Sequence, residues 1–142
     1  METYKELKRR QEKEFYEFPK EYALNDQRLN EILNEWGCKE EDVFTIGGGG
    51  IIRKTDAGRF AEMCERHLRE LQEALKNDKT GEGFIYEAFL HELGNYEYGY
   101  TEDAEPALLA LGLSEEKVQK DKALKHGFKK ASKEVLANAV CI

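Results

Sequence analysis

The sequence predicts a mainly α fold, a compact multi-helix domain over residues 1–142 that surrounds a central hydrophobic helix at about 84–98. Two observations support this prediction. Six of the 14 Phe and Tyr residues lie between Phe84 and Tyr100, and apolar residues cover well over half of the circumference of a helix built from that stretch. Elsewhere, apolar residues recur at steps of three and four, as in amphipathic helices. A helix that is apolar on most sides must be enclosed by other helices, so we expect one core.

Length and composition restrict the class of protein. A chain of 142 residues has the size of one domain, and 40% hydrophobic with 36% charged residues is typical of a folded globular protein. No stretch approaches the ~18 apolar residues that span a membrane, and the amino-terminal residues lack the apolar segment of a signal peptide. We therefore expect a cytoplasmic protein that does not associate with a membrane. Cys38, Cys64 and Cys141 form no CxxC pair and are predicted to be free thiols.

The first half of the chain predicts a helical hairpin. Apolar spacing indicates a first helix over 3–17. Asn25 or Asp26 would cap a second helix, since both residue types accept hydrogen bonds from the first free amides of a helix. That helix should end at Trp36, because Gly37 follows and glycine readily adopts the left-handed conformation that ends helices.

A glycine-rich segment follows the hairpin. Residues 43–46 are predicted to form a strand, and they precede four consecutive glycines at 47–50 and a second apolar pair at 51–52. Four glycines cost too much conformational entropy to lie within a helix. The segment therefore predicts one small β-hairpin near 43–53, with an irregular loop as the alternative.

Three more helices are expected besides the central one. A long helix should run from about Thr55 to Lys76, with a buried stripe formed by Phe60, Cys64, Leu68, Leu71 and Leu75. Pro106 is suited to the first turn of another helix, which should end near Leu111. Ser114 would cap a short helical turn, and a last helix is predicted over about 122–139.

Charge is distributed unevenly along the chain, whose formal net charge is −7. No Lys or Arg lies between Gly81 and Glu116, a stretch that holds nine Asp and Glu residues. The following stretch reverses the sign with Lys117, Lys120, Lys122, Lys125, Lys129, Lys130 and Lys133. The two stretches could neutralise each other in the fold, or the acidic one could face a basic partner.

The glycine run is the first candidate site. Gly48 to Thr55 matches the phosphate-loop pattern GxxxxGK[ST], except that Arg53 replaces the second glycine. A side chain at that position enters the space in which the backbone curls around phosphate, so nucleotide hydrolysis is disfavoured. A simpler anion site remains open, with the candidate residues Gly49, Gly50, Arg53, Lys54 and Thr55.

No residue is predicted to be catalytic, to bind a metal or to hold a cofactor. The pairs Cys64 with His67 and Glu87 with His91 have helical spacing, but the second His of an HExxH motif is missing. The segment 107–118 is spaced like a helix-turn-helix, yet its second helix would begin with two glutamates, which repel phosphate. Direct binding of nucleic acid is therefore not expected.

The second candidate site follows the central helix, where tyrosines alternate with acids. Tyrosine supplies contact area at a small entropic cost, and acidic residues select a basic partner. The alternative is that the tyrosines complete the core and the acids lie outside it. As a protein-binding surface, the site would comprise Tyr96, Glu97, Tyr98, Tyr100, Glu102 and Asp103.

Three segments carry a family resemblance: GGGGIIRKTDAGRF, DKTGEGFIYEAFLHELGNYEYGYT and LKHGFKKASKE. They resemble a family of small uncharacterised proteins of gut bacteria that are often carried near phage or conjugative-element genes. The family pattern reads Asn-His-Glu-Tyr where this chain has Asn95, Tyr96, Glu97 and Tyr98. A histidine used there as a ligand or base would be lost in this chain. The resemblance implies a cytoplasmic accessory protein of a mobile element and supplies no activity or catalytic residue.

The leading hypothesis is a non-enzymatic accessory protein that binds a partner with a basic surface, such as a defence nuclease whose nucleic-acid channel it would block. One alternative is a small anion- or nucleotide-binding protein or enzyme that uses the loop 47–55. The other is a structural subunit of a homo-oligomer, such as a homodimer, in which the central helix completes its burial. The sequence leaves the identity of any partner open.

Overall fold

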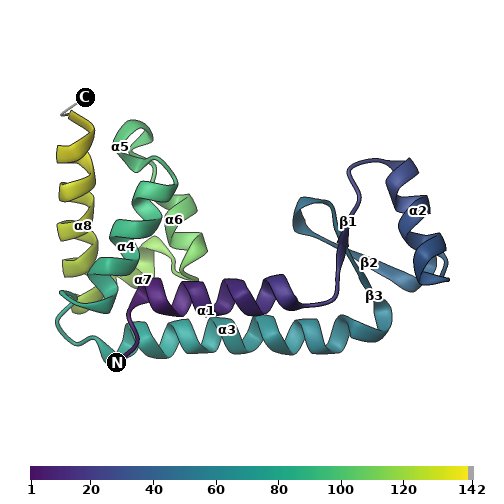
Figure 1. The fold of residues 1–142 in the computed structure, drawn as a ribbon. Coiled ribbons are helices and arrows are strands. Elements are labelled where there is room, and N and C mark those ends of the chain that lie inside the picture. The colour runs from purple at the N-terminus through teal and green to yellow at the C-terminus, as the bar shows by residue number, and fades with distance from the viewer. Residues whose placement is uncertain (141–142) are drawn as a thin grey trace. The chain divides into compact units, whose positions relative to one another are not determined.

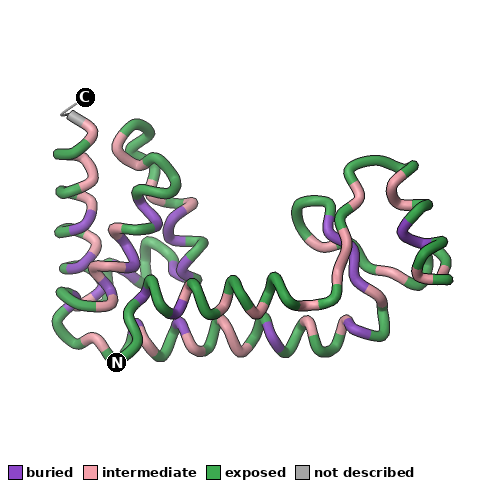
Figure 2. The backbone as a smooth tube through the Cα atoms, in the orientation of Figure 1, coloured by how far each residue is buried: buried purple, intermediate pink, exposed green. Residues whose placement is uncertain are grey.

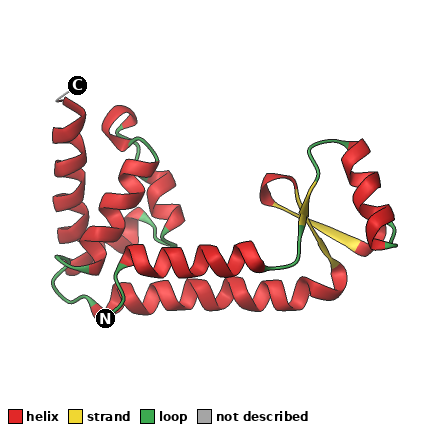
Figure 3. Cartoon of the chain, in the orientation of Figure 1, coloured by secondary structure: helices red, strands yellow, loops and turns green. Residues whose placement is uncertain are grey.

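The structure is a computed structural model that describes residues 1–140, so the predicted free thiol of Cys141 lies outside the described part. Within that part the chain forms eight α-helices and one small three-stranded sheet, which confirms the predicted mainly α class (Figure 3). Contacts divide the chain into two compact units. The helical unit comprises Met1–Gln11 and His67–Ile142, and the sheet unit comprises Glu12–Arg66. One domain over 1–142 stays a prediction.

The sheet unit contains three antiparallel strands in the order β1-β3-β2 (Figure 1). The β2–β3 hairpin confirms the predicted hairpin near 43–53, whereas β1 is only two residues long and was not predicted. The unit is built from the second part of α1 (Tyr4–Glu17), β1 (Glu21–Tyr22), α2 (Asp26–Trp36), β2 (Val43–Ile46), β3 (Gly50–Arg53) and the first part of α3 (Ala57–Asn77).

Local signals fix both ends of α2 as predicted. The Asn25 side chain accepts a hydrogen bond of 2.8 Å from the amide of Arg28, and Gly37 ends the helix in the left-handed conformation with φ of 63°. The glycine run forms the tip of the hairpin, where Gly49 has φ of 80°. Its carbonyl accepts from the amide of Ala23 at 2.9 Å, which ties the end of β1 to the hairpin.

The helical unit surrounds α4, as the sequence predicts. Ile85, Ala88, Phe89 and Leu93 of α4 are at most 1% exposed, and α4 packs mainly against α8 (Figures 1 and 2). The α4 helix ends three residues before the predicted end near 98, because Glu97 adopts the left-handed conformation with φ of 56°. Besides parts of α1 and α3, the unit contains α4 (Phe84–Asn95), α5 (Tyr98–Thr101), α6 (Glu105–Ala110), α7 (Glu115–Lys120) and α8 (Lys122–Val140).

The predicted stripe on α3 is wrong at Cys64 and Leu68, whereas Phe60 is partly buried and packs on Phe15 and Phe18. Cys64 is exposed and Leu68 is 45% exposed, whereas Met63 is buried in the sheet unit. Leu71 and Leu75 are buried in the helical unit, as predicted. Successive residues of an α-helix are rotated by about 100°. At this point of α3 the buried position is therefore one residue away from the predicted one, at Met63 instead of Cys64.

The loop before α4 is organised by Asp78. Its carboxylate accepts hydrogen bonds of 3.0 Å from the backbone amides of Gly81, Gly83 and Ile85, and it also accepts from Thr80. Burial raises the pKa of Asp78, but the hydrogen bonds from Ile85, Gly81, Thr80 and Gly83 together lower it more, so that the pKa lies below its usual value. The ionised carboxylate therefore stabilises the start of the central helix.

We expect acid to remove this stabilisation. Because the pKa of Asp78 is lower in the folded chain than its unfolded value of 3.8, the contribution is present above that pH and lost as pH falls through the folded pKa. The check is urea denaturation of the wild type and of Asp78→Asn between pH 7 and pH 3. The wild type should be the more stable at pH 7, and the difference should shrink on acidification. A difference independent of pH would contradict the assigned role.

Candidate functional site

A groove of about 630 Å³ lies between α5, α6, α7 and α8 of the helical unit. Apolar side chains form one part of its lining: Tyr98, Leu108, Leu109, Leu113, Val118 and Phe128. Exposed carboxylates form another part: Glu102, Asp103, Glu105 and Glu115. We call this site the acidic groove. Its lining suits a ligand that is both apolar and cationic.

Gly99 places α5 against α8. A Cβ atom at Gly99 would lie 2.7 Å from the Cβ of Ala139 and 3.3 Å from the carbonyl oxygen of Val135. Only glycine permits so close an approach of the two helices. The single turn of α5 is therefore held at the C-terminal end of α8, with Tyr98 directed into the groove.

The apolar floor of the groove continues into the core. The ring of Tyr98 meets that of Phe128 edge to face at 6.4 Å, and Phe128 meets the buried Phe89 in the same way at 5.4 Å. Leu108 and Leu113 are 7% exposed and Val118 is 2% exposed. Leu109 is an exception, because 68% of it is exposed at the edge of the groove. The floor is therefore closely packed on the core, and Leu109 offers accessible apolar area.

Side-chain hydrogen bonds to the backbone order the acidic segment between α5 and α6. The Thr101 hydroxyl accepts from the amide of Asp103, and the Asp103 carboxylate accepts from the amide of Glu105, each at 3.1 Å. Glu102 has φ of 55°, a left-handed conformation that is uncommon for residues other than glycine. The α6 helix begins at Glu105, one residue before the predicted start, with Pro106 in its first turn. These contacts fix the backbone that carries three of the four groove carboxylates.

The connection between α6 and α7 positions the fourth carboxylate. Leu113 donates a 2.8 Å backbone hydrogen bond to Leu108, and Gly112 between them has φ of 67°. Ser114 caps α7 through a 3.2 Å hydrogen bond from the amide of Lys117, as predicted. Glu115 therefore stands at the first position of α7, where the helix dipole stabilises its negative charge.

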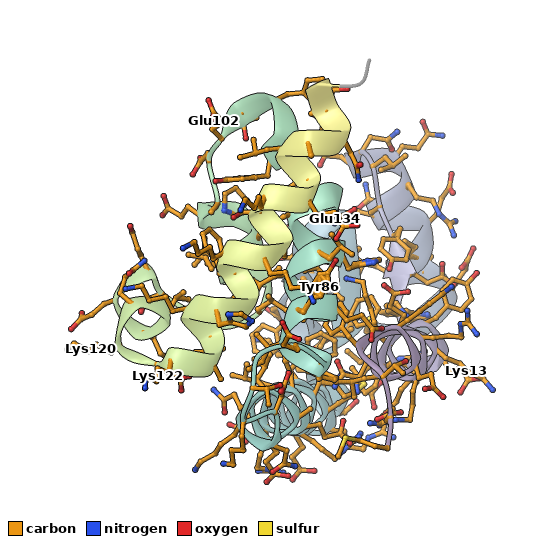
Figure 4. The ribbon with its side chains drawn as sticks, turned by 90° about the vertical axis from the view of Figure 1, so that its left-hand side faces the viewer. Lys13, Tyr86, Glu102, Lys120, Lys122 and Glu134 are labelled. Atoms are coloured by element: carbon orange, nitrogen blue, oxygen red, sulfur yellow. The ribbon has the colours of Figure 1, made fainter. Side chains whose placement is uncertain are left out.

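The acidic and basic stretches neutralise each other only in part. Glu82, in the loop before α4, contacts two residues of α8, His126 at 2.9 Å and Lys130 at 3.5 Å. Within residues 1–140, none of the four groove carboxylates forms an ion pair with Lys, Arg or His. In Figure 4, Glu102 lies toward the C-terminal end of α8, whereas Lys120 and Lys122 lie at its N-terminal end. The negative charge of the groove thus remains available.

Three of the six predicted protein-binding residues line the acidic groove, namely Tyr98, Glu102 and Asp103. The other three, Tyr96, Glu97 and Tyr100, do not line it, although Tyr96 is 41% and Tyr100 is 69% exposed. The apolar half of the groove was missed. The sequence holds a signal for it in the run ALLALGL after Pro106. When Leu108 and Leu111 face the core, Leu109 lies on another face of the helix and is exposed.

The predicted anion-binding residues lie in the sheet unit and do not form one loop. Gly49 and Gly50 lie at the hairpin tip, whereas Arg53, Lys54 and Thr55 follow at the far end of β3. The Arg53 guanidinium stacks on Trp36 at 4.3 Å, and the Lys54 ammonium lies 5.1 Å from the ring of Phe44. Anion binding by these residues stays a prediction, with two separate groups instead of a phosphate loop.

We expect no ATP or GTP hydrolysis from this segment, because its glycines and its cations are separated by the length of β3. Nucleotides with Mg²⁺ should leave the melting temperature of the wild type unchanged in a thermal-shift assay. Turnover or a thermal shift that disappears in Lys54→Ala would contradict this expectation and favour the enzyme alternative.

A buried polar cluster was also missed by the sequence analysis. Glu92 of α4 is 1% exposed, and its Oε2 atom accepts from the Tyr4 hydroxyl and, at 2.9 Å, from the Lys8 ammonium. Its Oε1 atom has no hydrogen-bond partner among the described residues. The ring of His91 lies 5.6 Å from that of Tyr4. These contacts attach the first turns of α1 to the central helix.

Comparison with known families identifies the chain's relatives. A model described as a family of unknown function (DUF7659) matches residues 3–134. The chain belongs to the DUF7659 family. The matched DUF7659 range includes the sheet, α4 and every residue that lines the acidic groove. No curated protein and no solved structure matches the chain.

Membership of DUF7659 confirms the expected relation to an uncharacterised family, whereas the link with gut bacteria and mobile elements stays a prediction. None of the helices within residues 1–140 has the length and apolarity that crossing a membrane requires.

Proposed function

We propose that the protein acts by binding a basic segment of a partner protein in the acidic groove. The observation that carries the proposal is the combination of an apolar floor with four carboxylates that lack cationic partners among the described residues. Lys and Arg side chains have the matching chemistry, since an apolar stem can cover the floor while the cationic head reaches a carboxylate.

The two parts of the groove contribute differently to binding. Exposed charges at the edge of an interface act mainly on the association rate and its salt dependence. Apolar anchors govern dissociation because water is excluded around them. Leu109 is 68% exposed and borders the buried floor. Of the apolar groove residues it therefore has the most surface to remove from water when a partner binds. We therefore assign steering to the carboxylates and residence time to Leu109 and Tyr98.

The partner class follows from the same chemistry. Proteins that bind nucleic acid carry clustered Lys and Arg on their binding surface. An acidic accessory protein that occupied such a surface would block a nuclease. The chain resembles proteins that are often carried near phage or conjugative-element genes, and this supports a host defence nuclease as the partner. In this proposal the protein is non-enzymatic and acts by competing with nucleic acid.

Charge reversal at one groove position tests the proposal. A fluorescent peptide of alternating Lys and Leu serves as the probe at low micromolar protein concentration, with a Glu-Leu peptide as the negative control. Glu115→Lys should weaken Kd about tenfold, which corresponds to about 1.4 kcal/mol. The matched control is Glu116→Lys, because Glu116 neighbours Glu115 on α7, pairs with Lys120 and does not line the groove. Equal losses from both variants would contradict the groove as the binding site.

Truncation of the apolar anchor is the companion measurement. Leu109→Ala should mainly speed dissociation of the same peptide, while its association rate stays close to that of the wild type. Leu24→Ala is the matched control, since Leu24 is 88% exposed and belongs to the sheet unit. An unchanged dissociation rate in Leu109→Ala would contradict the role of Leu109 as an apolar anchor.

A further inference from the structure

The last helix carries a second unneutralised surface. Lys122, Lys125, Lys129 and Lys133 recur at steps of three and four, which places them on one face of α8 over about 16 Å. All four are exposed, and none forms an ion pair within residues 1–140. We call this face the lysine stripe. It is a row of amphipathic cations of the kind that the acidic groove is suited to bind.

The lysine stripe and the acidic groove belong to the same unit but do not neutralise each other within one chain. No ion pair joins a groove carboxylate to a stripe lysine among the described residues. The helical unit holds 14 Lys and Arg against 16 Asp and Glu, so that two copies of it experience little net repulsion. Each copy therefore presents both halves of a complementary contact.

We infer that the acidic groove of one copy receives the lysine stripe of a second copy, so that the chain self-associates through its helical units. The inference rests on the proposed function of the groove and names its occupant when no other partner is bound. A nucleic-acid backbone is a less suitable occupant of the stripe, because the Phe128 ring that lies between these lysines in the sequence packs on Phe89 and Tyr98 and is not free to stack on bases.

Self-association would also regulate access of other partners to the groove. A partner with a basic segment would compete with the lysine stripe of the second copy, so partner binding and self-association would exclude each other at that groove. The lysine stems would cover the apolar floor near Leu109, and their ammonium groups would meet the carboxylates of Glu105 and Glu115.

Analytical ultracentrifugation of charge-swapped variants tests the inference. The groove variant carries Glu105→Lys and Glu115→Lys, and the stripe variant carries Lys125→Glu and Lys129→Glu. The wild type should exceed the monomer mass of 16.4 kDa as its concentration rises, whereas each variant alone should remain monomeric. An equimolar mixture of the two variants should associate again, because each then offers the opposite charge to the other. Misfolding would not be rescued by mixing, so restored mass identifies the two surfaces as partners.

A control variant with Glu40→Lys and Glu41→Lys applies the same change to exposed acids of the sheet unit and should associate like the wild type. A wild type that stays monomeric at all concentrations, or a mixture that stays monomeric, would overturn the inference. If the Lys-Leu peptide still binds the groove in that case, the proposed function stands without self-association. Stripe-dependent binding of duplex DNA by a monomeric wild type would instead assign the stripe to polyanions and also overturn the inference.

Discussion

Replacement of Phe89 by Ala is expected to lower the free energy of unfolding by about 3–5 kcal/mol, which is the usual cost of removing a buried Phe side chain. Phe89 is 0% exposed at the centre of the helical unit, and its ring packs edge to face on Phe128 at 5.4 Å. The cost combines lost apolar burial with the cavity that remains, since close-packed helices on several sides restrict collapse. Urea denaturation followed by far-UV circular dichroism measures the loss.

Phe44→Ala is the matched control for Phe89→Ala. Phe44 is 48% exposed on β2, so its removal should cost less than about 1 kcal/mol. A loss of under about 1 kcal/mol in Phe89→Ala would contradict the placement of α4 at the centre of the core.

The second large effect is expected at Gly127, where α8 crosses the loop before α4. A Cβ atom at this position would lie 2.5 Å from the Cγ2 of Ile85 and 2.8 Å from the carbonyl oxygen of Gly81. Both neighbours are buried, and Gly81 itself has φ of 81° and would place a Cβ atom 2.1 Å from the carbonyl oxygen of Ala123. Overpacking of this kind typically costs about 1–3 kcal/mol, and contact with backbone atoms leaves little room for relaxation.

The sign of the effect makes Gly127→Ala informative. Helix propensity alone favours Ala over Gly by about 1 kcal/mol within a helix. We expect destabilisation instead, because the steric conflict exceeds the gain in propensity. Gly94→Ala on α4 is the control, since a Cβ atom there would have no neighbour within 4 Å and should therefore stabilise the protein. Thermal denaturation of both variants provides the comparison, and stabilisation by Gly127→Ala would contradict the close packing of α8.

Local chemistry explains which parts of the fold could be predicted from the sequence. The caps at Asn25 and Ser114 and the helix end at Gly37 depend on residues only a few positions apart and appear as predicted, and α6 begins one residue before Pro106. The central position of α4 was predicted for a similar reason, because a helix that is apolar on most sides has few alternatives to burial.

The features that were missed depend on contacts between distant parts of the chain. Strand β1 has two residues, too few for any alternation of apolar and polar residues to be detected. Met63 is buried where its neighbour Cys64 was expected to be, because a step of three or of four residues from Phe60 is equally compatible with an amphipathic helix. Glu92 is buried because Tyr4 and Lys8, more than 80 positions earlier, supply its hydrogen bonds.

The acidic groove combines both cases. The carboxylates of Glu102 and Asp103 stood out in the sequence because no Lys or Arg lies near them along the chain. The apolar floor did not, since Leu108, Val118 and Phe128 come from three different helices and meet only in the folded unit. Tyr98 belongs to both descriptions, because it packs on Phe128 and also lines the groove.

The most direct measurement is to map the binding site of the Lys-Leu peptide by amide chemical-shift perturbation in the ¹⁵N-labelled protein. If the acidic groove receives a basic segment, the largest shifts should come from residues 102–105, 108–109 and 113–115, and the exposed acids at 40–42 of the sheet unit should be unaffected. Shifts spread over exposed acids of both units, with no concentration at Leu109 and Glu115, would contradict the groove as a binding site.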